Sequence, residues 1–189
     1  PRAARAIAGA EEALAHPGSA EAITGAAAVL DLLRARLAQR RGRTEAVQEH
    51  AERGLLAARD HAPATALCCA VLLLRAARMQ GDAEAVQRWL DEGRALHARV
   101  DNPWVRAQFD TAEGVYHIRA GLLDNAERVL LRAAYDTRKA RTEGLPRLPW
   151  MQAPPGNIDE NLAAVARLRG DHARMMEHLE AARDAYRAW

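Results

Sequence analysis

Apolar residues recur at spacings of three and four along nearly the whole chain, and short turns rich in glycine or polar residues interrupt them. This spacing predicts amphipathic α-helices. No segment of appreciable length alternates apolar and polar residues with a period of two, so the pattern predicts an all-α fold. The expected helices cover residues 1–15, 20–41, 44–61, 64–80, 83–99, 103–120, 124–141, 158–169 and 172–188.

Short polar side chains stand where several of these helices would begin. Ser19, Asp82 and Asn102 are placed to accept hydrogen bonds from the first helical turn. Asp124 and Asn157 are each followed three residues later by a glutamate, which is the spacing of a capping box. We therefore expect all five residues to be helix N-caps.

An internal repeat emerges when the chain is aligned on four glycines that follow helical runs. These glycines are separated by 39, 40 and 49 residues, at Gly42, Gly81, Gly121 and Gly170. A small residue stands twelve positions after each of them: Gly54, Gly93, Ala133 and Ala182. Glycine accepts the left-handed conformation that ends a helix, and small residues let two helices approach closely. The register therefore predicts antiparallel helix pairs joined at glycine turns.

This register resembles the tetratricopeptide repeat. The third unit carries the match best, at the family's small, turn and seam positions: Gly114, Gly121, Ala126, Leu130 and Ala133. The period is about five residues longer than the standard 34, as in the divergent repeats of large bacterial regulators of the STAND and LuxR types. The resemblance implies a right-handed α-solenoid of about nine helices, arranged as antiparallel pairs.

We expect a single repeat domain over residues 1–189, with a half repeat at 1–18, repeats at about 19–61, 62–101, 102–143 and 157–189, and a proline-rich insert at 144–156. The first helix occupies the second-helix position of a repeat, so we expect a fragment of a longer protein that self-associates through its exposed ends. The insert carries Trp150 and is either an ordered connector or a lid that contacts a ligand or partner.

Composition and charge narrow the function classes. The net charge is +2 and 44 of the 189 residues are alanine, so nothing global attracts the chain to nucleic acid. No apolar run approaches the ~18 residues of a membrane span. Adjacent Cys68 and Cys69 cannot easily form a bridge, because their side chains diverge on a helix. We expect them to be buried and inert in a soluble cytoplasmic protein.

Candidate catalytic chemistry is sparse. The seven histidines include no pair at the i, i+4 spacing of a helical zinc site. His117 stands at a seam position, where we expect a partly buried, hydrogen-bonded side chain and not a metal ligand or a base. A phosphate-binding P-loop and a nucleophile elbow are both absent from the sequence. We therefore expect no metal, no cofactor and no enzymatic activity.

A basic pattern is the strongest candidate for binding. In tetratricopeptide repeats the first helix of each unit lines a concave groove, and the resemblance places eight residues there: Arg36, Gln39, Arg75, Arg78, Gln108, Thr111, Glu160 and Arg167. The four arginines would grip carboxylates or phosphates through paired hydrogen bonds. Alternatively, they only complement the dipoles at the ends of their helices.

The groove would take a protein, a peptide or a small anionic ligand, and we expect no direct binding of nucleic acid or membrane. The resemblance then implies the sensor or interaction domain of a bacterial transcriptional regulator. A free-standing adaptor that scaffolds other proteins is the alternative.

Overall fold

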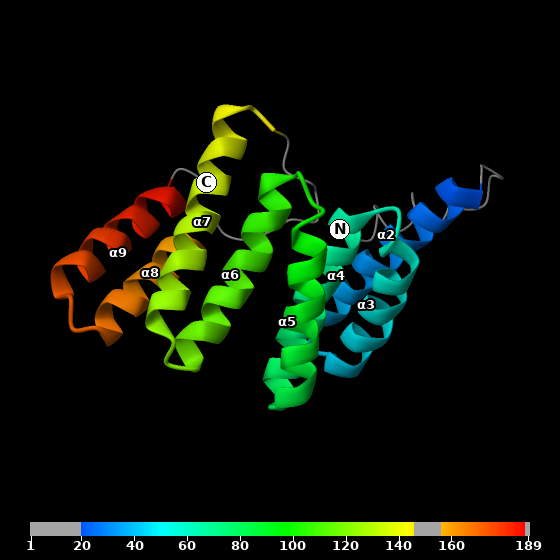
Figure 1. The fold of residues 1–189 in the computed structure, drawn as a ribbon, viewed down its shortest axis with the longest axis horizontal. Coiled ribbons are helices and arrows are strands. Elements are labelled where there is room, and N and C mark those ends of the chain that lie inside the picture. Colours follow the sequence, from blue (N-terminus) through cyan, green and yellow to red (C-terminus); the bar gives the residue numbers. More distant parts are fainter. Residues whose placement is uncertain (1–19, 146–155, 188–189) are drawn as a thin grey trace. The chain divides into compact units, whose positions relative to one another are not determined.

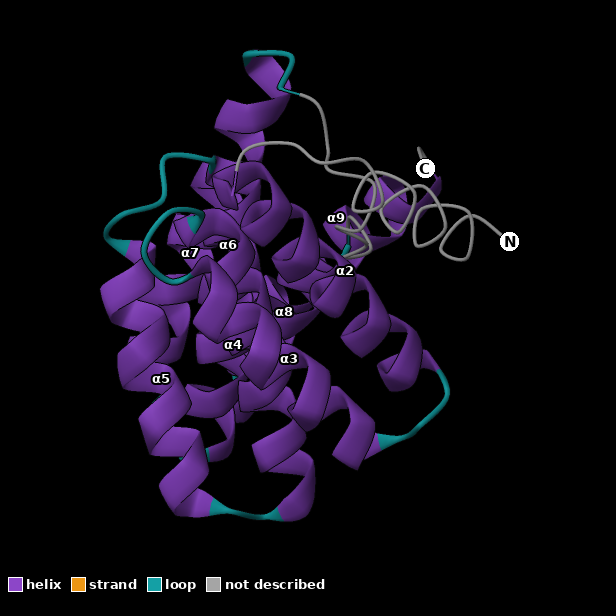
Figure 2. Cartoon of the chain, turned by 90° about the vertical axis from the view of Figure 1, so that its right-hand side faces the viewer, coloured by secondary structure: helices purple, strands orange, loops and turns teal. Residues whose placement is uncertain are grey.

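Eight α-helices make up the part of the chain that the structure, a computed structural model, describes, which is residues 20–145 and 156–187 (Figure 1). The same residues contain no strand (Figure 2). The helices are α2 (Ala20–Arg40), α3 (Thr44–Ala58), α4 (Pro63–Gln80), α5 (Ala83–His97), α6 (Pro103–Arg119), α7 (Leu123–Thr142), α8 (Asn157–Leu168) and α9 (His172–Arg187).

The all-α prediction is thus confirmed for these residues, and each helix predicted within them is present, with ends that agree to within three positions. The helix predicted at 1–15 and the cap Ser19 lie outside the described residues. Among the eight described helices, none combines the length and the apolar character that a membrane span needs.

The glycine turns join the helices in antiparallel pairs: α2 with α3, α4 with α5, α6 with α7, and α8 with α9 (Figure 1). The backbone φ angle is 67° at Gly42, 73° at Gly81, 72° at Gly121 and 77° at Gly170. Residues with a Cβ rarely adopt this left-handed region, so glycine allows the chain to reverse direction there. The turns predicted from the glycine register are confirmed.

Small residues at the predicted seam positions are buried. Gly54, Gly93, Ala133 and Ala182 are all shielded from solvent. A Cβ atom at Gly54 would lie 3.0 Å from the sulfur of Cys69 and 3.2 Å from the carbonyl oxygen of Ala28. The neighbouring helices therefore approach α3 more closely than any larger side chain would allow.

Two of the predicted N-caps are confirmed and two are wrong. Asp82 accepts a hydrogen bond from the Ala85 amide at 2.9 Å, and Asn102 accepts two from the first turn of α6. By contrast, α7 begins at Leu123 and α8 begins at Asn157, one residue before each predicted start, so Asp124 and Asn157 lie inside their helices. The earlier start places Leu123 against a core cluster of Ala126, Leu130, Leu162 and Val165. This apolar packing outweighs the capping preference.

The helices divide into two compact units at the boundary between Val100 and Asp101. The first unit contains α2 to α5 and the second contains α6 to α9, and both show the same neighbour pattern. In the first unit, α3 contacts α2 and α4, and α2 also contacts α4; in the second, α7 contacts α6 and α8, and α6 also contacts α8. Each unit therefore repeats one arrangement of two packed hairpins.

Polar contacts at one register position join the two hairpins of each unit. In the first unit Gln48 and Gln80 exchange side-chain hydrogen bonds of 2.8 and 3.1 Å. In the second unit the Arg169 guanidinium donates to the Glu127 carboxylate. Gln80 and Arg169 each stand directly before the turn glycine of their own hairpin. Gln48 and Glu127 each stand six residues after the turn glycine of the preceding hairpin. The repeat seen in the sequence is therefore also a repeat of contacts.

Candidate functional site

Three of the predicted groove residues come together in the first unit: Arg36 on α2, and Arg75 and Arg78 on α4. We call these residues the arginine cluster. Arg75 and Arg78 are one turn apart and share a face of α4, and α2 lies against α4. All three side chains are partly buried.

The electrostatics of the cluster are unfavourable for its central cation. Burial and the neighbouring charges of Arg36 and Arg78 lower the pKa of Arg75 to about 10. Within the described part of the chain no carboxylate opposes these effects on Arg75. Like charges held close to one another in a partly buried site raise the free energy of the protonated form of Arg75.

Cys68 and Cys69 lie beneath the cluster on α4, and both are free and buried. Burial raises the pKa of each thiol, although the Arg36 guanidinium, which donates a hydrogen bond to Cys68, opposes the rise there. At neutral pH both groups are therefore protonated and shielded. The prediction that they are buried is confirmed.

The other predicted groove residues have different surroundings. Gln39 is partly buried near the end of α2. In the second unit, Gln108 and Thr111 are buried in α6, and the Thr111 hydroxyl donates to the Ala107 carbonyl at 2.6 Å. Glu160 and Arg167 are exposed on α8. Trp150 lies outside the described residues.

A buried polar network between α6 and α7 was not predicted. Arg106 donates two hydrogen bonds, of 2.9 and 2.8 Å, to the carboxylate of Asp136, and Arg132 donates two, of 2.8 and 2.6 Å, to that of Asp110. The two aspartates are 3% and 0% exposed. A signal was present in the sequence, because Asp136 falls in the apolar phase of α7, three residues after buried Ala133. A charged residue at a core position indicates a buried ion pair.

His117 belongs to the same region and is buried, more deeply than the partly buried position predicted for it. Its Nε2 atom lies 3.6 Å from a carboxylate oxygen of Glu113, one turn earlier on α6. The described residues contain no group of three or more histidine, cysteine or acidic side chains arranged to hold a metal ion.

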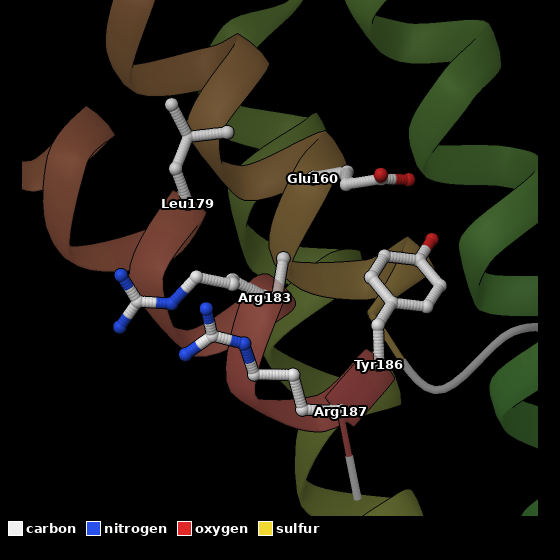
Figure 3. Close-up of a pocket in the computed structure, with 6 residues that line it drawn as sticks. Glu160, Leu179, Arg183, Tyr186 and Arg187 are labelled. Atoms are coloured by element: carbon white, nitrogen blue, oxygen red, sulfur yellow. The ribbon is translucent and has the colours of Figure 1, made fainter. Parts of the chain in front are cut away.

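A pocket of about 470 Å³ opens between α8 and α9 in the second unit (Figure 3). It is lined by Glu160, Leu179, Ala182, Arg183, Tyr186 and Arg187. The Tyr186 hydroxyl points toward Glu160 and donates a hydrogen bond to its carboxylate. Burial and this hydrogen bond raise the pKa of Tyr186. A Cβ at Gly156 would lie 2.5 Å from the tyrosine ring, so only glycine lets the ring take this position.

Comparison with solved structures adds a fold relationship. The chain is similar to the crystal structure of BtubC (BKLC) from P. vanneervenii, with a TM-score of 0.66 and 18% sequence identity, over 99% of this chain and 74% of that chain. This chain has the fold of BtubC. At 18% identity the likeness to BtubC concerns the fold alone. No protein-family model and no curated protein sequence matches the chain.

Proposed function

We propose that the chain is a non-catalytic recognition module that binds an anionic group, a carboxylate or a phosphate, on the arginine cluster. In this proposal the hairpins stack as a tetratricopeptide-like right-handed α-solenoid and present the cluster on its concave side. The module would act as the sensor or interaction domain of a bacterial transcriptional regulator.

The single observation that supports anion binding is the state of Arg75. The pKa of Arg75 falls to about 10 because of burial, Arg36 and Arg78, and no carboxylate in the described part of the chain opposes the fall. An anion bound beside Arg75 would supply a compensating negative charge, and the Arg75 guanidinium can donate two parallel hydrogen bonds to it.

The same observation argues against the helix-dipole explanation. A favourable dipole at a helix C-terminus stabilises a cation and would raise its pKa. Arg78 lies in the last turn of α4, where this explanation fits. Arg75 lies five residues before the end of the helix, and its pKa is lowered.

Titration with sulfate, phosphate and a short peptide rich in glutamate tests the proposal. Heat release on mixing, and the melting temperature at low ionic strength, are the measurements. We expect each anion to bind and to raise the melting temperature, because a ligand that binds only the folded state stabilises it. Binding should weaken as salt is added, since charges are screened beyond about 8–10 Å at physiological ionic strength.

Matched variants separate specific binding from general charge attraction. We expect Arg75→Lys to weaken binding by about tenfold, because a point charge cannot replace a forked donor. Arg88→Lys, an exposed position on α5, is the control and should leave binding unchanged. Equal affinity in both variants, or no saturable binding to the wild type, would refute the proposal.

A further inference from the structure

Three apolar side chains on one face of α9 are exposed to solvent. Met176, Leu179 and Tyr186 are 51%, 42% and 37% exposed. Arg183 and Arg187 follow one another at i, i+4 and extend to the same side of the helix (Figure 3). We call these five residues the α9 face. Because Glu160 and Gly156 hold the tyrosine ring in place, the face has a defined shape.

The internal repeat shows what covers the same face elsewhere. Leu179 stands nine residues after its turn glycine, as Leu130 does in α7 and Ala51 does in α3. Both Leu130 and Ala51 are 0% exposed, and Leu130 packs with Leu162 and Val165 of α8. Hence α8, the first helix of the following hairpin, covers this position of α7, whereas Leu179 at the same position of α9 is 42% exposed.

A second position of the repeat carries an arginine near the following hairpin. Arg59, Arg138 and Arg187 all stand seventeen residues after a turn glycine. Arg59 forms a 2.9 Å ion pair with Glu92 of the following hairpin.

Arg138 has a comparable neighbour in the second unit. It lies near Asp159, in the first turn of α8, where its charge acts on that carboxyl together with those of Arg141 and His178. Arg187 occupies the same position on α9, and within the described residues it has no ion pair. Arg187 is therefore a cation that a carboxylate from a neighbouring helix would neutralise.

We propose that the α9 face is a docking site for an amphipathic helix of a partner protein, with acidic residues in its first turn and an apolar face behind them. The helix would lie antiparallel to α9, as α8 lies against α7. Its apolar residues would contact Met176, Leu179 and Tyr186, and its first-turn carboxylate would pair with Arg187 and Arg183. This site is separate from the arginine cluster and does not depend on it.

The chain supplies a suitable probe for the test. A peptide with the sequence of residues 157–168, blocked at both ends, has the acidic first turn and the apolar face that cover α7. Titrating it into the full-length ¹⁵N-labelled chain, with amide chemical shifts as the readout, reports both affinity and location. An isolated helix of this length is marginal in water, so we expect weak but saturable binding, with shifts concentrated at residues 176–187.

Charge reversal gives the decisive comparison. We expect Arg187→Glu to weaken binding by about threefold to tenfold, the range for an exposed ion pair converted to a repulsive contact. A second peptide with Asp159→Lys and Glu160→Lys should bind the Arg187→Glu variant better than it binds the wild type. Arg128→Glu, an exposed position on α7, is the control and should bind the original peptide as the wild type does.

A second variant distinguishes loss of peptide binding from loss of the folded structure. Met176→Glu alters a half-exposed side chain, so its circular dichroism should match the wild type while peptide binding is lost. Shifts confined to α7 would mean that the peptide replaces the native α8, and that result would overturn the proposal. So would a concentration-dependent dimer in sedimentation that Met176→Glu abolishes, because the face would then be occupied by a second copy.

Discussion

Replacing Arg75 by methionine should stabilise the folded chain. The substitution keeps an unbranched apolar stem but removes a guanidinium that is partly buried between Arg36 and Arg78. Since the pKa of Arg75 falls from 12.5 to about 10, and each unit corresponds to about 1.36 kcal/mol, the upper limit of the gain is about 3 kcal/mol. The side chain is partly exposed to solvent, which screens the charge, so we expect about 1–3 kcal/mol.

The sign of this effect follows from linkage. Folding lowers the pKa of a base here, so the folded state holds this proton less tightly than the unfolded state. The penalty is fully present at any pH below about 10, and it disappears as the pH rises from there toward 12.5. The gain from Arg75→Met should therefore be constant around neutral pH.

Urea denaturation followed by circular dichroism at pH 7 and low salt measures the effect. Arg119→Met, at an exposed position on α6, is the control and should change the free energy of unfolding by no more than about 0.5 kcal/mol. Added salt should narrow the difference between Arg75→Met and the wild type, because it screens the repulsion in the wild type. If Arg75→Met instead lowers the free energy of unfolding by more than about 1 kcal/mol, the guanidinium has a stabilising partner and the reasoning is wrong.

Three further substitutions or reactions test the packing. Ala133→Leu should lower the free energy of unfolding by about 1–3 kcal/mol, because Ala133 is 0% exposed at a helix seam; an unchanged denaturation midpoint would show that the seam has room. Arg132→Ala should cost about 3 kcal/mol, measured in the same way, since it leaves the fully buried Asp110 carboxylate without its paired donors. Cys68 and Cys69 should react with a thiol reagent at pH 8 only after denaturation, because burial raises both pKa values; rapid labelling of the native chain would contradict this.

The sequence was most informative where the cause of the structure is local. Apolar spacing and the positive φ of Gly42 and Gly81 depend on a few neighbouring residues, so helices and turns could be predicted from them. The start of α7 could not, because it depends on packing of Leu123 against Leu162, which lies 39 residues away in the sequence. Local capping preferences of about 1 kcal/mol are readily outweighed by such packing.

In the candidate sites, too, features set by the repeat could be predicted, whereas features set by the packing of two helices could not. The convergence of Arg36 with Arg75 could be anticipated, since the two positions are one repeat apart and the first helices of successive hairpins meet. The ion pairs of Asp110 and Asp136 could not be assigned from spacing, because they depend on the distance between α6 and α7. The pocket beside Tyr186 also escaped prediction, since it requires the close approach of Gly156 to the tyrosine ring.

Contacts between hairpins have a consequence for how the chain acquires its structure. The hydrogen bonds that join them link residues only 32 to 45 positions apart, from Gln48 with Gln80 to Asp124 with Arg169. Such a low contact order favours rapid folding, because little loop entropy is lost before each contact forms. During synthesis the two hairpins of each unit can pack as soon as the second has left the ribosome, without waiting for distant sequence. Assembly then proceeds along the chain as stepwise growth from its N-terminal side.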